Sequence, residues 1–452
     1  MLIEQAISSR LETLKPEPIA EAYFDTACAL KAVAEASVCA EHALDTLEFL
    51  SKRVEISRGL YESYLSTGGR ATHRWLDVPY LELALLLLVR DFLRLEQAGQ
   101  SVVALKRLNA VLKLLAFVKT QSTEVDEDLV SFINTRADQF LNGFAASSTA
   151  ETPSQLSPVK PLLKELDVTV LFWEGPIARA YLTTLKGMGL KPKKIIHLIS
   201  ANDLASAKPI GRFLPGTARL AYAHYRQKSS IHYWSRALQI KESELFNSLK
   251  RSIESSLGFS DAIVDEALAV KDLRTYSSSI EKLMINGLKD NALHSYLAAL
   301  PETTLLFTGG GIVPKALLDM PHLKFVHVHP GYLPDVRGAD CALWSELVKG
   351  RTSATCFYMA PGIDDGDIIQ ASYLPVINID VSRSGKDLKT LYRATYAFVD
   401  PWLRARVLRE AIIKTLGFTD VKAVSQNESS SMTYHFMHER IQDAVFGRMF
   451  KA

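Results

Sequence analysis

Residues that can do acid–base chemistry are concentrated between positions 327 and 367 of this 452-residue chain. His327 and His329 end an alternating apolar segment just before a Pro-Gly pair, and Asp364 lies in the glycine-flanked loop GIDDGD. An imidazole and a carboxylate that share one proton path are common partners in general acid–base catalysis. The helix-like segment LWSELV separates the two clusters, so a strand and a helix could bring them into one cleft.

The two histidines are expected to point to the same side of a strand end. Side chains alternate along a strand, so positions 327 and 329 share one face. The carboxyl ends of parallel strands border the crevice in which α/β proteins bind ligands. A neutral imidazole there can take a proton from an amine, and a protonated one can stabilise an oxyanion. The alternative for one ring is a structural histidine bonded to a backbone carbonyl.

The loop GIDDGD supplies three crowded carboxylates, Asp364, Asp365 and Asp367. One of them could orient an imidazole, although a solvated Asp-Gly turn is the common alternative. A Mg²⁺ or Ca²⁺ site is a third interpretation, but the loop lacks the spacing and distal glutamate of an EF-hand, so no metal is predicted. The triplet Gly309–Gly311 lets backbone groups approach a flat ligand, but it is not the GxGxxG of a dinucleotide site.

The composition is that of a soluble globular protein with two or three domains. Hydrophobic residues make up 48% and charged residues 23%, and a net charge of +2 gives no global field toward nucleic acid or anionic lipid. The four cysteines lack metal-ligand spacing and are expected to be reduced thiols: Cys28, Cys39, Cys341 and Cys356. Neither a signal peptide nor a membrane span is evident, which predicts a cytoplasmic protein without a membrane partner.

Composition shifts divide the chain into four predicted parts. They are an all-helical N-terminal domain (1–146), a Ser-, Thr- and Pro-rich linker (147–164), a catalytic domain (165–375) and a mostly helical C-terminal extension (376–452). The first part has apolar residues at three- and four-residue spacing and no fixed repeat. It is expected to be a scaffold or docking surface, through which the chain could form a homo-oligomer or bind a protein partner.

Five short apolar runs predict strands: residues 167–173, 193–199, 303–309, 325–329 and 354–359. Helices between them favour an open, mostly parallel sheet with helices on both faces, the Rossmann-like class of α/β fold. Residues 205–300 are not assigned. Their aromatic and basic segment 222–234 could stack on bases, but an amphipathic surface helix is favoured. A further helix is expected near 388–414.

The ordered motifs from Thr308 to Gln370 resemble the core of the folate-dependent formyltransferases. That family has an apolar-Pro-Lys segment after a glycine turn, then N-x-H-P-S-x-L-P-x-x-R-G, G-x-T and G-x-D-x-G-x-I. This chain has GGGIVPK, HVHPGYLPDVRG, GRT and GIDDGDI in the same order, with a weaker likeness back to Asp167. The resemblance implies an enzyme that passes the formyl group of 10-formyltetrahydrofolate to an amine.

The resemblance also implies roles for particular residues. The family's catalytic histidine and aspartate fall on His329 and Asp364, with His327 beside them, and His329 would manage the proton with help from Asp364. The folate would lie against Gly311, Ile312, Val313, Gly362 and Asp364.

Three positions depart from the family pattern. His327 replaces an asparagine, Gly331 replaces the usual serine, and Asp340 stands near where proline is common. His327 can imitate the asparagine N–H toward the formyl oxygen through a ring N–H, better if protonated. Two adjacent imidazoles, however, disfavour double protonation and lower the pKa of at least one ring.

The acceptor is expected to be a small-molecule amine, of the amino sugar, amino acid or hydroxylamine type. Methionyl-tRNA formyltransferases carry a basic C-terminal β-barrel, whereas only 78 residues follow Leu374 here and they look helical. With a net charge near zero, this argues against nucleic acid as a partner. The alternatives are a methionyl-tRNA formyltransferase, a formyltetrahydrofolate hydrolase and a non-catalytic protein that binds folate or a partner.

Overall fold

The computed structural model describes residues 78–121, 125–147, 165–204, 206–427 and 431–450, together with Ile3, Gln5, Ala6 and Ser9. Two compact units, Met1–Phe144 and Ala145–Ala452, make up the chain. Nearly all of the predicted linker 147–164 lies outside the described residues, as does much of the predicted helical domain with Cys28 and Cys39. The four domain limits therefore stay predictions.

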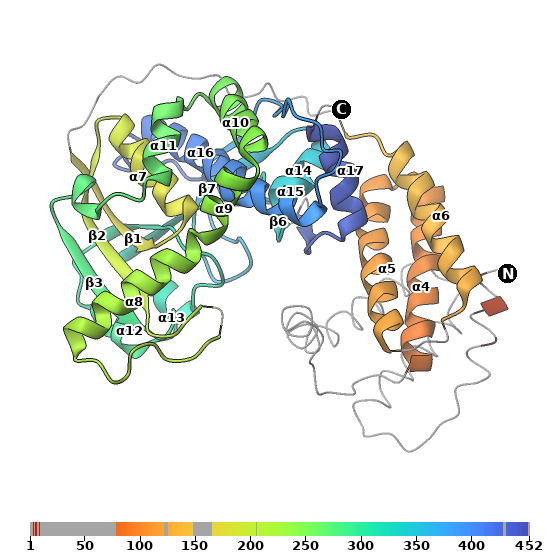
Figure 1. Ribbon diagram of the computed structural model, residues 1–452, viewed down its shortest axis with the longest axis horizontal. Coiled ribbons are helices and arrows are strands. Elements are labelled where there is room, and N and C mark those ends of the chain that lie inside the picture. Colours follow the sequence, from red (N-terminus) through yellow and green to blue (C-terminus); the bar gives the residue numbers. More distant parts are fainter. Residues whose placement is uncertain are drawn as a thin grey trace. The chain divides into compact units, whose positions relative to one another are not determined.

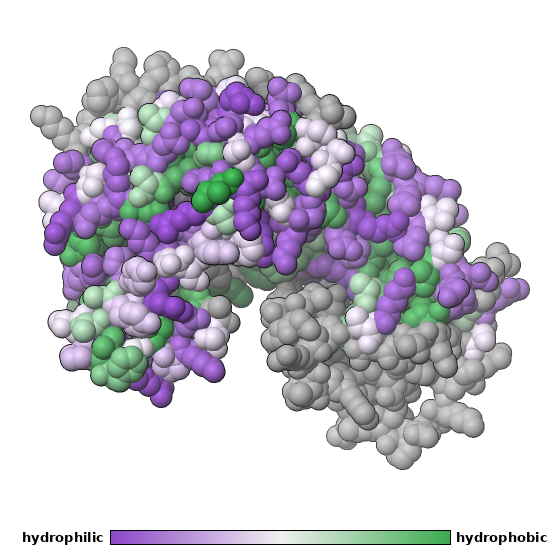
Figure 2. All heavy atoms as spheres, in the orientation of Figure 1, coloured by the Kyte–Doolittle hydropathy of each residue, from purple (hydrophilic) through white to green (hydrophobic). Residues whose placement is uncertain are grey.

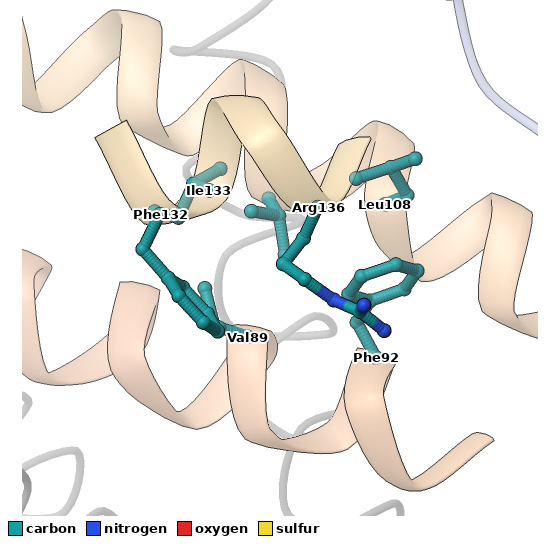
Figure 3. A pocket seen from close by; sticks show the side chains of 7 residues that line it. Val89, Phe92, Leu108, Phe132, Ile133 and Arg136 are labelled. Carbon is teal, nitrogen blue, oxygen red and sulfur yellow. The ribbon is translucent and has the colours of Figure 1, made fainter. Parts of the chain in front are cut away.

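Three helices are described in the first unit (Figure 1): α4 (Val78–Gln97), α5 (Ser101–Gln121) and α6 (Glu127–Gly143). The Asp126 carboxylate caps α6 by accepting bonds from the backbone N–H groups of Asp128 and Leu129. A shallow pocket between the helices is mostly apolar (Figure 3), lined by Val89, Phe92, Leu108, Val111, Phe132, Ile133 and Arg136. The guanidinium of Arg136 in α6 forms an ion pair with Glu96 in α4 at 2.5 Å. Apolar contacts and an ion pair of this kind are ordinary between packed helices.

The second unit contains a seven-stranded sheet in the order β3-β2-β1-β4-β5-β7-β8. Its strands are β1 (Glu165–Trp173), β2 (Lys191–Ser200), β3 (Ile280–Ile285), β4 (Thr303–Phe307), β5 (Leu323–His329), β7 (Ser353–Tyr358) and β8 (Ile368–Tyr373). The first five pair in parallel with one another, while β7 pairs antiparallel with both β5 and β8. The predicted Rossmann-like, mostly parallel sheet is confirmed, and all five predicted strands are present.

Two sheet strands, β3 and β8, were not predicted. β3 is an edge strand whose exposed Glu281 and Lys282 break the apolar pattern. It lies in the unassigned region, which also forms α8 (Gly216–Ile231), α9 (Tyr233–Lys241), α10 (Ser243–Ser252), α11 (Asp261–Leu268) and α12 (Asn291–Ala298). The preference for a surface helix at 222–234 is confirmed, since these residues lie mainly in α8 and Tyr225 is 67% exposed.

Helices cover both faces of the sheet. On one face α12 and α13 (Lys315–Leu318) cover a core that includes Leu171, Ile196 and Phe325. On the other, α8 packs on β2, while α16 (Asp400–Lys414) packs on β5, β7 and α7 (Pro176–Gly187). Side chains alternate along each strand, so Phe172 and His197 face away from that first core.

The C-terminal residues complete the second unit rather than trailing from it. The expected helix near 388–414 is present as α15 (Leu388–Ala394), a π-helical turn (Thr395–Val399) and α16. The short strand β9 (Thr433–Tyr434) pairs with β6 (Arg337–Gly338), and α17 (Glu439–Met449) packs on α14 (Cys341–Lys349) and α15.

The surface of the described residues is mixed. Figure 2 shows hydrophilic side chains over most of the coloured surface, with apolar ones scattered between them. None of the described helices is long and apolar enough to cross a membrane.

Asp340 is a buried anchor for this C-terminal part. One carboxylate oxygen accepts hydrogen bonds from the Tyr392 and Tyr396 hydroxyls, both at 2.7 Å, and the other accepts from the Met437 N–H at 2.8 Å. Burial and the Asp340 charge together raise the pKa of both phenols, so they stay donors. Asp340 thereby ties α15, the π-helical turn and the segment after β9 to the start of α14.

We expect Asp340→Ala to lower the free energy of unfolding by about 2–4 kcal/mol, because three donors lose a charged acceptor in a buried place. Urea unfolding of the full chain measures this. The matched control is Asp420→Ala, since Asp420 is exposed. Equal stability of both variants would contradict the anchoring role.

Candidate active site

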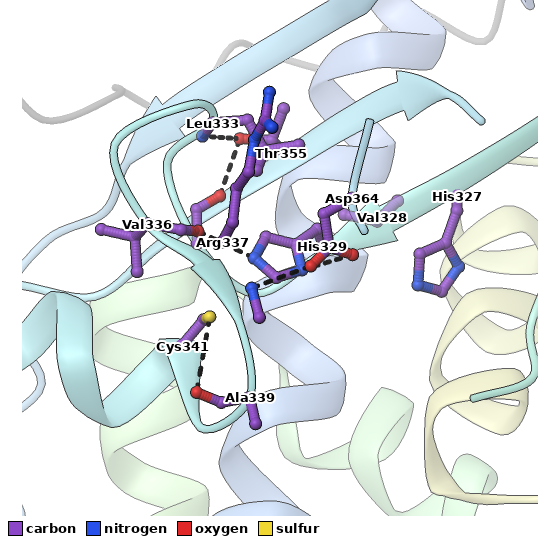
Figure 4. Close-up of polar contacts among 12 residues, drawn as sticks. His327, Val328, His329, Leu333, Val336, Arg337, Ala339, Cys341, Thr355 and Asp364 are labelled. Atoms are coloured by element: carbon purple, nitrogen blue, oxygen red, sulfur yellow. Dashed lines mark hydrogen bonds and ion pairs between the residues drawn. The ribbon is translucent and has the colours of Figure 1, made fainter. Parts of the chain in front are cut away.

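The structure brings His329 and Asp364 together, as the motif order predicted (Figure 4). His329 ends β5, and Asp364 lies in the loop between β7 and β8. Their Nδ1 and Oδ1 atoms are 3.3 Å apart, and the side chains are 3% and 20% exposed. An ion pair this shielded from water is stronger than a surface pair.

The Asp364 carboxylate is held by a turn and by the C-terminal segment. Its backbone has φ +51°, and its Oδ2 accepts the Gly338 N–H at 2.9 Å. The Gln426 amide donates to the carbonyl oxygens of Asp364 (3.0 Å) and Gly366 (2.7 Å), and accepts from Arg337 at 2.7 Å. Burial opposes ionisation of Asp364, but His329 and the Gly338 N–H outweigh it and hold the pKa well below its usual range.

Both ring nitrogens of His329 face acceptors. Nε2 is 2.9 Å from the carbonyl oxygen of Val336, while Nδ1 faces the ionised Asp364. A carbonyl and a carboxylate can only accept, so both contacts are favourable only when each nitrogen carries a proton. Both ring nitrogens of His329 are thus occupied by contacts within the protein.

Gly331 makes this arrangement possible. A Cβ at this position would lie 2.3 Å from the Val336 oxygen and 2.8 Å from His329 Nε2. The Thr355 hydroxyl fixes the same turn, donating to the Gly331 carbonyl at 2.7 Å and accepting from the Leu333 N–H at 3.0 Å. The serine that is usual in the family would not fit this turn without a shift of residue 336.

His327 is in a different environment. Its Nδ1 is 3.1 Å from the Phe307 carbonyl, and its ring contacts those of Phe307 and Phe357. Burial, and then the charge of Arg404, lowers its pKa to about 4, so the ring is neutral at pH 7. The lowering was expected from the two imidazoles, but burial is its main cause and His329 contributes least.

This protonation state changes what His327 can offer. A neutral ring has one N–H, and the Phe307 carbonyl takes it at Nδ1. Nε2 is then an acceptor, so the N–H expected for the formyl oxygen is already used. His327 supplies a lone pair instead.

The residues predicted to contact folate lie in two loops that follow the strands on either side of β5. Gly311, Ile312 and Val313 follow β4, and Gly362 belongs to the loop after β7. Ile312 is 78% exposed and Val313 only 4%, so Val313 anchors its loop in the core. The order of the parallel strands reverses between β1 and β4, which is where open α/β sheets bind ligands.

The other two aspartates of GIDDGD bond to the loop and to the C-terminal segment beside it. Asp365 accepts from the Gly366 N–H at 2.8 Å, and Asp367 accepts from the Ser425 hydroxyl at 3.0 Å. Gln426, by contrast, was missed, because it lies far along the chain from Asp364 with no motif around it. Arg404 was missed too: it donates to the Val328 carbonyl at 2.8 Å from α16.

Comparison with known proteins agrees with the motif analysis. The formyl transferase family model matches residues 266–393. The chain is 38% identical over 103 residues to the methionyl-tRNA formyltransferase of Syntrophus aciditrophicus, covering 22% of this chain and 33% of the relative. It is 36% identical over 87 residues to that of Geobacillus thermodenitrificans, covering 19% and 27%. It therefore spans about a third of the length of the curated relatives it matches.

Residues 266–393 of this chain match the formyl transferase family. The predicted family membership is thus confirmed for the segment that carries the histidines and Asp364. Among solved structures, a sugar N-formyltransferase from a Shewanella species aligns with 62% of this chain and 87% of its own, at 11% identity and a TM-score of 0.32.

We expect Gln426→Ala to lower kcat about 10-fold with little change in unfolding free energy, since its amide holds the backbone of the Asp364 loop from outside. Steady-state assays with saturating formyl donor measure this. Gln442→Ala, which also removes an amide that bonds a C-terminal carbonyl, is the control. A kcat equal to that of the control would show that Asp364 keeps its place without Gln426.

Proposed function

We propose that this chain is a cytoplasmic enzyme that transfers the formyl group of 10-formyltetrahydrofolate to the amine of a small-molecule acceptor. The observation that best supports this proposal is the pair of His329 and Asp364, which is largely shielded from water and lies beside a neutral His327. All three residues lie in the segment that matches the family. The three side chains combine a fixed cation, its counter-ion and a free ring lone pair. Addition of an amine to a formyl group needs a proton acceptor and stabilisation of an oxyanion.

The two histidines divide the work in this proposal. The acceptor amine attacks the formyl carbon, and His327 Nε2 takes the proton that the amine loses. The imidazolium of His329, held between Asp364 and the Val336 carbonyl, stabilises the oxyanion through its charge. When the oxyanion collapses, the bond from the formyl carbon to N10 of the folate breaks, and N10 takes up the proton from His327.

The folate is proposed to lie between the loop Gly311–Val313 and the loop that holds Gly362 and Asp364. Gly311 has φ +87° and no atom within 4 Å of a Cβ placed there, so its backbone is open to a flat ring. This role needs no metal ion at the site of transfer.

A second candidate acceptor is methionyl-tRNA, and one observation favours it. Seven Lys or Arg residues and no Asp or Glu lie between Asp203 and Glu242, with exposed aromatic side chains among them, such as Phe213 (85%) and Tyr225 (67%). A basic stretch of this kind suits an anionic ligand. The same stretch would equally bind the phosphates of a small amine that is linked to a nucleotide. A small-molecule amine therefore stays the first proposal for the acceptor.

The test is incubation of the purified chain with 10-formyltetrahydrofolate alone, with a panel of amino sugars, amino acids and hydroxylamines, and with methionyl-tRNA. We expect tetrahydrofolate release only when the right small amine is present, and Asp364→Asn should abolish it. Release without any amine would indicate a hydrolase, and release only with methionyl-tRNA would replace the acceptor class. If the purified chain does not bind the folate at all, every proposal that it is an enzyme is wrong.

The division of roles is tested at His327. We expect His327→Asn to lower kcat/KM by about 10²–10⁴-fold, because asparagine cannot take a proton. On the acid side, the parent enzyme should lose activity as pH falls through about 4, where the Nε2 lone pair of His327 is protonated. The pH–rate profile measures this. A near-normal rate for His327→Asn would show that His329 leaves Val336 and serves as the base.

A further inference from the structure

Three side chains whose types can ligate a metal ion lie together away from the candidate active site. Glu174 directly follows β1, His197 lies in β2 and His224 lies in α8. One ligand atom from each residue lies within 4.8 Å of those of the other two. His197 points to the sheet face opposite that of His327, because it alternates with Ile196 while His327 alternates in phase with Phe325. This cluster therefore has no part in the proposed formyl transfer.

His197 is a buried polar side chain without a partner. It is 0% exposed, and neither ring nitrogen hydrogen-bonds to any described residue. Its ring instead packs edge-on against Phe172 (5.1 Å) and His224 (4.7 Å). Buried polar groups are nearly always satisfied by a partner. The unpartnered ring of His197 therefore indicates that a ligand binds here.

Both imidazoles are in the protonation state that binds metal ions. Burial, and then His224, lowers the pKa of His197 to about 3. Burial, and then Lys282, lowers the pKa of His224. A neutral imidazole offers a lone pair without first losing a proton. His224 is only partly buried, so it leaves the cluster open to solvent on one side.

Glu174 is ionised and held in place by its own partners. Its Oε1 accepts from Arg179 and His232, both at 2.9 Å, and its Oε2 accepts from Arg179 at 2.6 Å. Burial opposes its charge, but Arg179 and His232 outweigh burial and hold its pKa well below the usual range. Oε2 accepts one bond and keeps one lone pair. Outer contacts of this kind orient metal ligands in known sites.

We propose that His197, His224 and Glu174 bind one divalent transition-metal ion, for which Zn²⁺ is the best match. Two neutral imidazoles and one carboxylate suit Zn²⁺, whereas Mg²⁺ and Ca²⁺ prefer oxygen ligands alone. A tetrahedral ion with bonds of about 2.0–2.1 Å brings ligand atoms to about 3.4 Å from one another, so the group closes modestly around it. The fourth position faces solvent beside His224.

The nearby cations set the expected strength of this site. Arg179 bonds Glu174, and Lys282 is the cross-strand neighbour of His197. Both repel an ion, so the affinity should be below that of a closed structural zinc site. The ion would link the end of β1, the middle of β2 and α8, the first helix of the basic stretch. Its role is thus to hold that helix on the sheet.

The test uses the full chain after treatment with EDTA, titrated with Co²⁺ and Zn²⁺. We expect Co²⁺ to produce the visible absorption of a tetrahedral site, which Zn²⁺ removes, and Zn²⁺ to raise Tm. His224→Gln and His197→Phe should each lower the affinity at least about 100-fold. His294→Gln is the matched control, because His294 is an exposed histidine on α12.

The variants decide the outcome, because a chain with 11 histidines can bind ions elsewhere. Unchanged Co²⁺ spectra in His224→Gln and His197→Phe would overturn the proposal, as would the lack of any tetrahedral spectrum in the parent chain. Tm in EDTA separates metal binding from folding. His197→Phe removes an unpartnered polar ring from a buried place, so without metal its Tm should equal or exceed that of the parent.

Discussion

The hydrogen bond from the Gly338 N–H to Asp364 is the contact on which the candidate active site depends. Gly338 stands at φ +101°, and a Cβ there would lie 2.1 Å from the Tyr434 carbonyl oxygen. The short pairing of β6 with β9 thus fixes the turn that fixes Asp364, and Asp364 in turn holds His329. Asp340, two residues on, secures the same turn through the two tyrosines. The C-terminal segment therefore helps to orient the Asp364 carboxylate.

His327 and His329 show how two identical side chains on one strand acquire different chemistry. Both have a ring nitrogen facing a backbone carbonyl. His329 adds a carboxylate beside its other nitrogen, whereas His327 has aromatic rings beside it and lies in the field of Arg404. The sequence pattern HVH contains no sign of this difference. It comes from residues 364 and 404, which reach the strand end from other elements.

The sequence was sufficient to predict five strands of the sheet and the pairing of His329 with Asp364. It was not sufficient to predict the residues that surround this pair. Buried strands such as residues 323–329 are apolar runs that need no tertiary information, and the spacing of His329 and Asp364 is carried by the motifs. β3 was missed because an edge strand tolerates charges such as Glu281. Gln426 and the pairing of His197 with His224 could not be predicted, because their contacts join distant segments through side-chain directions that no local pattern encodes.

Two of the three departures from the family pattern, at positions 327 and 331, fit together on the proposed division of roles. Glycine at 331 lets the Val336 carbonyl reach His329, so that Nε2 of His329 is occupied by this contact. On the proposed division of roles, the proton acceptor must then lie elsewhere, and position 327 is the next side chain on the same strand face. Asparagine there could only donate to the formyl oxygen or accept through its amide oxygen. A histidine kept neutral by burial can take and return a proton, so the substitutions at 327 and 331 are best understood as a coupled pair rather than as two separate losses.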